Sequence, residues 1–297
     1  MGDRAFYRHY LLLAVPMILQ NAITNLVSFL DNIMVGQLGT EQMSGVAIVN
    51  QLIFVYNLAI FGAVSAASIF GAQYFGYGDH RGHMHSFRFK LYATLLVSGL
   101  TMLLLLTKGS DLISLYLTAT AGNGATDVAL QYGKQYLVIM LVGLVPFAVN
   151  QAYATNIKET GQTLVPMLAS FVAVGTNAVL DYLLIFGVGP FPELGVTGAA
   201  LATVIARYVE AVIVVFWAHR NREKNRYLEG AYRGFGIPVS ELKTILIKGL
   251  PLMFNEVLWA AGMTTVTQCY SVRGLDVVAG LNIATTITNL FNIVYIQ

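Results

Sequence analysis

Long apolar runs, separated by short polar breaks, dominate the chain. Runs near 20 apolar residues recur, which is the length needed to cross roughly 30 Å of hydrocarbon. The breaks carry Gly, Pro or charged residues, and residues 221–239 form the only long polar connection. We therefore predict an all-α polytopic membrane protein with about eight transmembrane helices. The predicted spans are residues 7–37, 44–74, 84–107, 125–156, 162–187, 195–219, 240–272 and 275 to the end.

The composition supports a membrane protein and excludes an ordinary soluble domain. Of the 297 residues, 56% are hydrophobic and only 11% are charged, whereas a soluble domain carries about 25% charged residues. The single cysteine, Cys269, excludes an intrachain disulfide framework.

The distribution of Lys and Arg predicts the orientation of the chain. With the N-terminus inside, 13 of the 17 basic residues fall on the inner side of the membrane. This is the positive-inside pattern, so we expect a multi-pass protein of a bacterial or archaeal-type cell membrane with a cytoplasmic N-terminus. The inner residues are Arg4, Arg8, Arg81, Arg88, Lys90, Lys158, Arg220, Arg222, Lys224, Arg226, Arg233, Lys243 and Lys248.

An internal repeat relates the two ends of the chain. A shift of 235 residues aligns Pro16 with Pro251 and brings two further glycine pairs and an acidic pair into register. Six spans per repeat leave both halves in one orientation, which indicates a parallel repeat. We predict a six-helix N-terminal bundle at 1–220, a cytoplasmic linker at 221–239, and the first two helices of an incomplete second bundle at 240–297. The alternative is a natural eight-helix protein.

Two carboxylates lie inside apolar runs. Asp31 follows the run that begins at Leu11, and Asp181 lies four residues after Asn177, on the same helix face. An Asp at the bilayer centre costs about 2.5–3.5 kcal/mol, so such residues mark functional sites. Counting along spans of alternating direction places Asp31, Asn177, Asp181 and Thr203 at similar depth, where they offer oxygen ligands for a cation such as sodium. The carboxylates also suit a shared proton, and a structural role remains the alternative.

Other ionisable residues receive different interpretations. Glu256 lies near mid-depth in the seventh span and is a candidate for contact with a cationic substrate or for carrying a proton. Arg207 and Glu210 are three residues apart, and we expect them to satisfy each other. The histidines between Asp79 and His85 are interpreted as part of a solvated connection rather than a metal site.

Four segments resemble the multidrug and toxic compound extrusion (MATE) family. PMILQNAITNLVSFLDNIMVGQLG begins at Pro16, and GAQYFGYGDHRGHMHSFRFK spans the second break. NAVLDYLLIFG followed by GVTGAALAT resembles the fifth and sixth spans of the family, and PLMFNE resembles the seventh. The resemblance covers the whole chain, which lacks the last four of the family's twelve spans and is in that sense C-terminally truncated.

The resemblance implies two bundles facing a central cleft and alternating between outward- and inward-open forms. It implies antiport, in which sodium ions or protons drive the export of organic, often cationic, drugs. The acidic pocket of the family corresponds here to Asp31, Asn177, Asp181 and Thr203, and its seventh-span acid corresponds to Glu256. We expect drugs and the lipid bilayer as partners, no nucleic acid, no cofactor beyond the coupling ion, and a monomeric full-length protein.

Three other functions compete with drug export. A lipid-linked sugar flippase would line its cleft with Arg and Lys, whereas most membrane-embedded charges here are acidic. A non-transporting membrane scaffold remains open. Enzymatic activity is not expected, because the chain contains neither a His-Glu-x-x-His nor a Gly-x-Ser-x-Gly motif.

Overall fold

The computed structural model describes residues 4–118, 125–233 and 236–271, without some of the side chains, mainly in the first and last helices. The predicted all-α fold is confirmed, and the described helices follow the predicted spans closely. They are α1 (Arg4–Gly36), α2 (Thr40–Tyr77), α3 (His80–Thr118), α4 (Ala125–Val142), α5 (Leu144–Glu159), α6 (Leu164–Phe186), α7 (Val196–Arg220), the short 3₁₀ helix η1 (Arg226–Leu228) and α8 (Val239–Ser271). The predicted eighth span lies outside the described residues.

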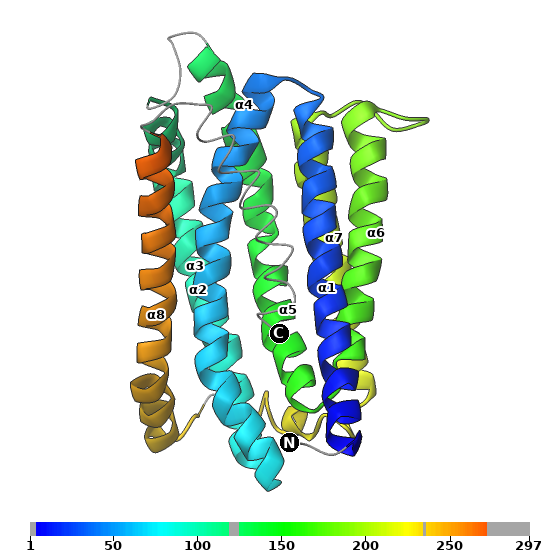
Figure 1. The fold of residues 1–297 in the computed structure, drawn as a ribbon, viewed down its shortest axis with the longest axis vertical. Coiled ribbons are helices and arrows are strands. Elements are labelled where there is room, and N and C mark those ends of the chain that lie inside the picture. Colours follow the sequence, from blue (N-terminus) through cyan, green and yellow to red (C-terminus); the bar gives the residue numbers. More distant parts are fainter. Residues whose placement is uncertain (1–3, 119–124, 234–235, 272–297) are drawn as a thin grey trace.

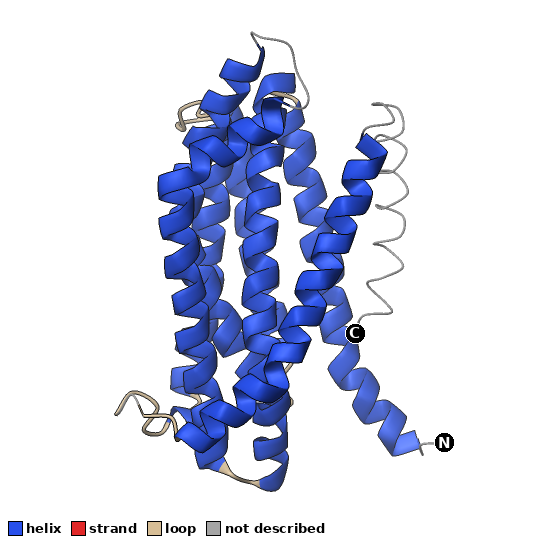
Figure 2. Cartoon of the chain, turned by 90° about the vertical axis from the view of Figure 1, so that its left-hand side faces the viewer, coloured by secondary structure: helices blue, strands red, loops and turns tan. Residues whose placement is uncertain are grey.

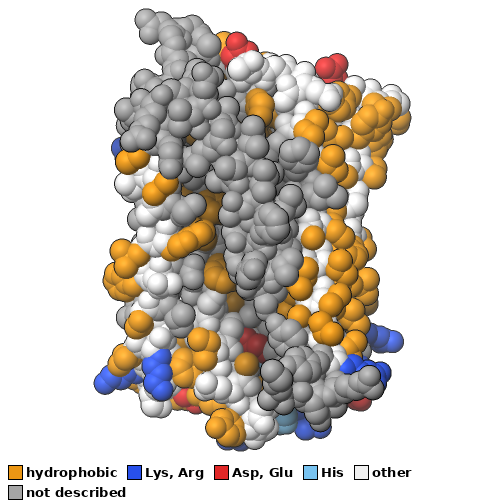
Figure 3. Space-filling model, in the orientation of Figure 1, with side chains coloured by type: hydrophobic (Ala, Val, Ile, Leu, Met, Phe, Trp, Pro, Cys, Tyr) orange, Lys and Arg blue, Asp and Glu red, His pale blue; other side chains and the backbone are white. Residues whose placement is uncertain are grey.

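The surface has the character expected in a bilayer. Within the described residues, α2, α3, α6 and α7 are each long and apolar enough to cross a membrane, and α4 and α5 together pass the same test. On the described part of the face in Figure 3, hydrophobic side chains are spread over the height of the bundle, whereas most Lys and Arg lie at its lower end. This lower end of the bundle, as drawn in Figure 1, also holds the N-terminus.

The helices stand side by side in one bundle (Figure 1). α2 packs against α3, α4 and α5, while α6 pairs with α7. α1 packs mainly against α6, where the Gln20 amide donates to Ser170 Oγ at 2.7 Å. Seen from the side, the lower part of α1 leans away from the other helices (Figure 2). α8 packs on the outside of α2.

The two halves of the predicted repeat give similar helices. α1 and α8 each span 33 described residues, and each contains one internal proline, Pro16 and Pro251. In both helices this proline is the thirteenth described residue, as the 235-residue shift requires.

The fourth predicted span is broken rather than continuous. α4 and α5 meet at Gly143 with a bend of 44°. Pro146 has no N–H to donate to the carbonyl of Val142, which instead accepts a hydrogen bond from the Tyr208 hydroxyl at 3.5 Å. The Tyr56 hydroxyl donates to the Leu144 carbonyl at 2.8 Å. Side chains of α2 and α7 therefore supply donors to the backbone on both sides of the break.

A buried polar network lies at the lower end of α3. The Lys90 ammonium, fully buried, contacts the side chains of Asn156 and Glu159 on α5. His83 Nε2 lies 3.3 Å from a Glu159 oxygen, and the His83 side chain is 3% exposed. The interpretation of this segment as a solvated connection is therefore wrong for His83. α3 begins at His80, before the predicted start, so His83 already lies on a helix face that packs against α5.

The linker between α7 and α8 is attached to the bundle. Arg88 donates three hydrogen bonds from its guanidinium to the carbonyls of Gly230, Ala231 and Gly236, at 2.7–2.9 Å. Tyr227 is buried against Phe87, with ring centroids 5.0 Å apart. Burial raises the pKa of the Tyr227 phenol, which stays neutral and acts as a packing group.

We expect Gly45→Val to destabilise the bundle strongly. A Cβ at Gly45 would lie 2.5 Å from the Ala129 carbonyl oxygen, so α2 and α4 would have to separate. Overpacking costs about 1–3 kcal/mol, and contact with backbone favours the upper part of that range. Thermal unfolding in detergent measures the effect. Gly99→Ala is the control, because a Cβ there would meet nothing within 4 Å, and equal melting of the two variants would contradict the prediction.

Candidate functional site

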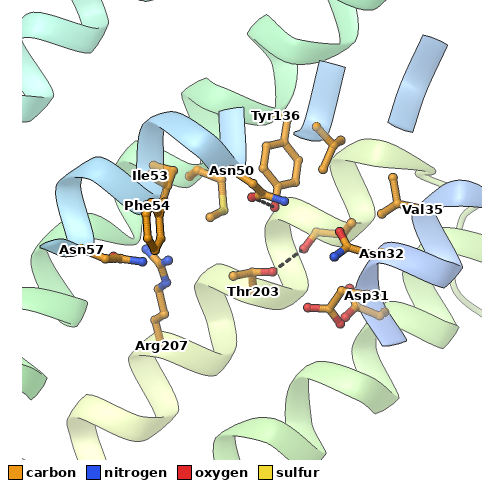
Figure 4. A pocket seen from close by; sticks show the side chains of 14 residues that line it. Asp31, Asn32, Val35, Asn50, Ile53, Phe54, Asn57, Tyr136, Thr203 and Arg207 are labelled. Atoms are coloured by element: carbon orange, nitrogen blue, oxygen red, sulfur yellow. Dashed lines mark hydrogen bonds between the residues drawn. The ribbon is translucent and has the colours of Figure 1, made fainter. Parts of the chain in front are cut away.

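A cavity of about 290 Å³ lies between α1, α2, α4, α6 and α7. We call it the acidic cavity, because two of its lining residues are the carboxylates Asp31 and Asp181 (Figure 4). The remaining lining residues are Asn32, Val35, Val46, Asn50, Ile53, Phe54, Asn57, Tyr136, Met140, Ala199, Thr203 and Arg207.

The structure brings Asp31 and Asp181 together from different helices. Asp31 lies near the upper end of α1 and Asp181 near the upper end of α6, the helix against which α1 packs. Both carboxyl groups line the acidic cavity. Asp181 is only 1% exposed, and neither of its oxygens accepts a hydrogen bond. Two negative charges in one cavity repel each other, so the pair favours binding of a proton or a metal cation.

The other two predicted ligands flank this pair. Thr203 on α7 lines the acidic cavity, and its hydroxyl donates to the Ala199 carbonyl at 3.0 Å, so the hydroxyl oxygen keeps its role as an acceptor. Asn177 is buried one helical turn before Asp181 and lies beside it, although it is not among the residues that line the cavity.

The residues of the cavity wall that sequence reasoning missed include Tyr136 and Arg207. Tyr136, which is almost fully buried, donates its hydroxyl to Asn50 Oδ1 at 3.3 Å (Figure 4). Arg207 follows Thr203 by four residues on α7, and that spacing places both on one helix face. The spacing was a usable signal for Arg207. Nothing in the sequence around Tyr136 distinguishes it from the many other aromatic residues of the chain.

The expected pairing of Arg207 with Glu210 is wrong. Among the described side chains, no ion pair within 4 Å joins them. Arg207 Nη1 donates to the Gly143 carbonyl at 3.4 Å, and its guanidinium carbon lies 5.1 Å from the ring centroid of Phe147. Glu210 instead accepts a hydrogen bond from the Ser170 hydroxyl on α6. Arg207 and Glu210 therefore each have partners on a neighbouring helix, because these side chains of α7 project toward α5 and α6.

Glu256 and the histidines complete the predicted residues. Glu256 belongs to α8, but its side chain lies outside the described part of the structure. His80 and His85 contact Arg226 and Glu241 respectively, at 3.4 and 2.8 Å. Among the described residues, no group of three His, Cys, Asp or Glu side chains could hold a metal ion.

The acidic cavity nevertheless presents oxygens of the kind that bind small cations. In the described part of the chain, nine buried side-chain polar atoms have no hydrogen-bond partner. Four of them are oxygens that line this cavity, one each from Asp31 and Asn57 and two from Asp181. Buried polar atoms are usually paired, and carboxylate and amide oxygens are the ligands that hard cations prefer.

Comparison with known protein families shows to which family this chain belongs. The sequence profile of the MatE family matches residues 16–183, which is more than half of the chain. The chain belongs to the MatE family. This family consists of membrane transporters, so the chain is a multi-pass membrane protein of a transporter family rather than a member of an enzyme family.

Individual MatE relatives are similar over most of the chain. A probable multidrug resistance protein NorM of Thermotoga maritima is 26% identical over 280 residues, which cover 94% of this chain and 58% of the relative. A protein of the same description from Rhizobium meliloti is 30% identical over 224 residues, covering 74% and 46%. The chain thus spans about half to three-fifths of the length of these curated relatives.

The fold agrees with that of solved MATE structures. The outward-facing conformation of a multidrug resistance MATE transporter superposes with a TM-score of 0.82 at 23% identity, over 97% of this chain and 61% of that one. This likeness concerns the fold.

Proposed function

We propose that the chain forms part of a cation-coupled antiporter that exports organic, often cationic, drugs by alternating access. The observation that carries the proposal is the pair Asp31 and Asp181, which lines one cavity and carries three buried oxygens without a hydrogen-bond partner. Membership of the MatE family and the drug-resistance relatives support drugs as the substrate class.

The coupling step follows from the position of α1. Asp31 is carried by the helix that leans away from the bundle at its lower end (Figure 2), and Asp181 by the helix that α1 packs against. Without a cation, repulsion between the carboxylates opposes close packing of α1 on α6. Binding of a sodium ion or a proton removes that repulsion and stabilises the packed form. A ligand shifts a conformational equilibrium only by such differential affinity.

Drug binding belongs to the face shared with the second bundle. α8 supplies the first wall of that bundle, with Glu256 as the candidate contact for a cationic drug. Cation and drug affect each other reciprocally when they favour different forms of the protein, because coupling free energies are symmetric. We expect the 297-residue chain alone not to catalyse antiport.

The first test is efflux from cells that express the full-length protein, at controlled sodium and pH, with and without Asp31→Asn. Efflux that follows one gradient and falls by about tenfold or more in the variant is the expected result. Dependence on sodium at constant pH identifies sodium as the coupling ion, whereas dependence on pH alone identifies the proton.

Two outcomes contradict the proposal. Wild-type efflux in Asp31→Asn removes the assignment of the coupling site. Absence of efflux under either gradient, with the protein present in the membrane, removes drug export and returns attention to a lipid flippase. Asp111→Asn is the matched control, because Asp111 is an exposed acid whose side chain is 71% accessible.

A further inference from the structure

A second cavity lies above the acidic cavity. It has a volume of about 370 Å³ and is lined by the end of α1, the start of α2, α4 and the loop between α6 and α7. We call it the upper cavity. Its polar lining residues include Gln42, Gln135, Glu193 and Thr197. The acidic cavity does not share these residues, and the proposed coupling site does not include them.

The two cavities are stacked along α4, along α7 and along the end of α1 with its following turn. The upper cavity contacts Leu38, in the turn after α1, and the acidic cavity contacts Val35, three residues earlier near the end of α1. Four residues separate Tyr132 from Tyr136 on α4, and three separate Val196 from Ala199 on α7. In each case the residue of the upper cavity is nearer the upper end of the bundle (Figure 1). One helical turn, about 5.4 Å, therefore separates the cavities.

A thin layer of apolar side chains separates the upper cavity from the acidic cavity. Val35, Val196 and Ala199 are 3–4% exposed and belong to the hydrophobic core of the bundle. Polar groups lie on both sides of this layer. Hydrophobic constrictions of this kind control the passage of ions.

The upper cavity offers oxygen ligands in a fixed frame. Gln42 Oε1 is buried and accepts no hydrogen bond. The loop that carries Glu193 is held by a hydrogen bond of 2.8 Å from the Leu194 N–H to the Leu184 carbonyl. Gly187 has a left-handed φ of 64°, and a Cβ there would lie 2.7 Å from the Glu193 nitrogen. The position of Glu193 is therefore set by the ends of α6 and α7.

A positive charge lines the opposite end of the acidic cavity. Arg207 lies one turn below Thr203 on α7, fixed by the Gly143 carbonyl and the Phe147 ring. A fixed arginine is an electrostatic barrier to cations. The acidic cavity is thus bounded by Arg207 below and by the apolar layer and Glu193 above.

We propose that the upper cavity is an uptake site through which a small monovalent cation reaches Asp31 and Asp181 from the membrane side opposite the N-terminus. The Glu193 carboxylate attracts the cation, and the Gln42 carbonyl oxygen replaces part of its water shell. The cation then passes the Val35–Val196 layer when α1 moves. This inference rests on the proposed function, because it supplies the path for the coupling ion.

The test is the dependence of efflux by the full-length protein on sodium at fixed pH, and on pH at fixed sodium. Glu193→Lys should raise the half-saturating cation concentration by about tenfold, since charges at a cleft change local ion concentration by factors of this size. The maximal rate at saturating cation should stay unchanged, which separates uptake from loss of folding. Asp127→Asn, an exposed acid at the same end, is the control and should leave both quantities unchanged.

A second measurement does not depend on the folding of a charge-reversal variant. Gln135→Cys in a Cys269→Ser background is modified by a cationic methanethiosulfonate reagent added to the side opposite the N-terminus. Modification should raise the half-saturating cation concentration, as Glu193→Lys does.

The outcomes separate the two proposals. If Glu193→Lys and the modified Gln135→Cys both keep the wild-type cation dependence while Asp31→Asn abolishes efflux, the uptake site is overturned and the antiporter stands. If wild-type efflux follows neither gradient, both are overturned. A raised half-saturating concentration with unchanged maximal rate supports both.

Discussion

Replacing Asp181 with Asn is expected to abolish cation-coupled efflux and at the same time to stabilise the protein. Asn has the same shape but removes one of the two charges that bind the cation. We expect efflux to fall by about tenfold or more. Asp181 is 1% exposed and its oxygens accept no hydrogen bond, so its charge costs folding free energy in the absence of a cation. The midpoint of thermal unfolding in sodium-free detergent solution should therefore rise by a few degrees.

The carboxylate pair should behave as one unit. The double variant Asp31→Asn, Asp181→Asn should transport no less than either single variant, because groups that act together give non-additive losses. If sodium is the coupling ion, it should raise the melting temperature of the wild type, as a ligand of the folded state does, and not that of Asp181→Asn. Additive losses in the double variant, or an Asp181→Asn protein that melts earlier in the absence of sodium, would contradict this account.

Lys90→Met should be among the most destabilising single substitutions in the described bundle. It would leave Glu159, whose side chain is 6% exposed, without its principal cationic partner. Removing one partner of a buried ion pair costs about 3–5 kcal/mol, because the remaining charge stays desolvated. Thermal unfolding in detergent, or denaturant titration of the purified protein, measures the loss.

Two control variants distinguish the effect of leaving a buried charge unpaired from the effect of removing a lysine charge. The double variant Lys90→Met, Glu159→Gln should recover most of the stability, because no uncompensated charge remains. Lys108→Met breaks an ion pair of 3.5 Å in which both side chains are about two-thirds exposed, and it should cost less than about 1 kcal/mol. A Lys90→Met protein as stable as Lys108→Met would show that the network at the lower end contributes little.

The sequence predicted the helices and the convergence of the acidic residues for simple physical reasons. Apolar run length follows from bilayer thickness, so the described spans agree with the predicted ranges within a few residues, apart from a longer α3 and the break at Gly143. Asn177 and Asp181 share a face because residues four apart lie on one side of a helix. Counting residues along the spans predicted that both lie at the same depth in the membrane as Asp31. Their role in coupling stays a prediction, whereas their proximity in space is a finding.

The side-chain partners and the break between α4 and α5 depend on contacts between helices, which cannot be predicted from the spacing of residues along one helix. Arg207 and Glu210 could have met along α7, but each has a partner on a neighbouring helix. Gly143 and Pro146 are visible in the sequence, yet membrane helices tolerate both residues when neighbours supply hydrogen bonds. Those neighbours, Tyr56 and Tyr208, are known only from the packing.

The hydrogen bonds of Arg88 shorten the free part of the linker between α7 and α8. Three hydrogen bonds hold Gly230, Ala231 and Gly236 on the first bundle, so the free part of the tether is only the short stretch from Gly236 to the start of α8. A shorter tether raises the effective concentration of α8 at its docking surface on α2. It also costs less loop-closure entropy when the second half assembles. During synthesis, we therefore expect α8 to dock on α2 early, because little free chain separates it from the rest of the described bundle.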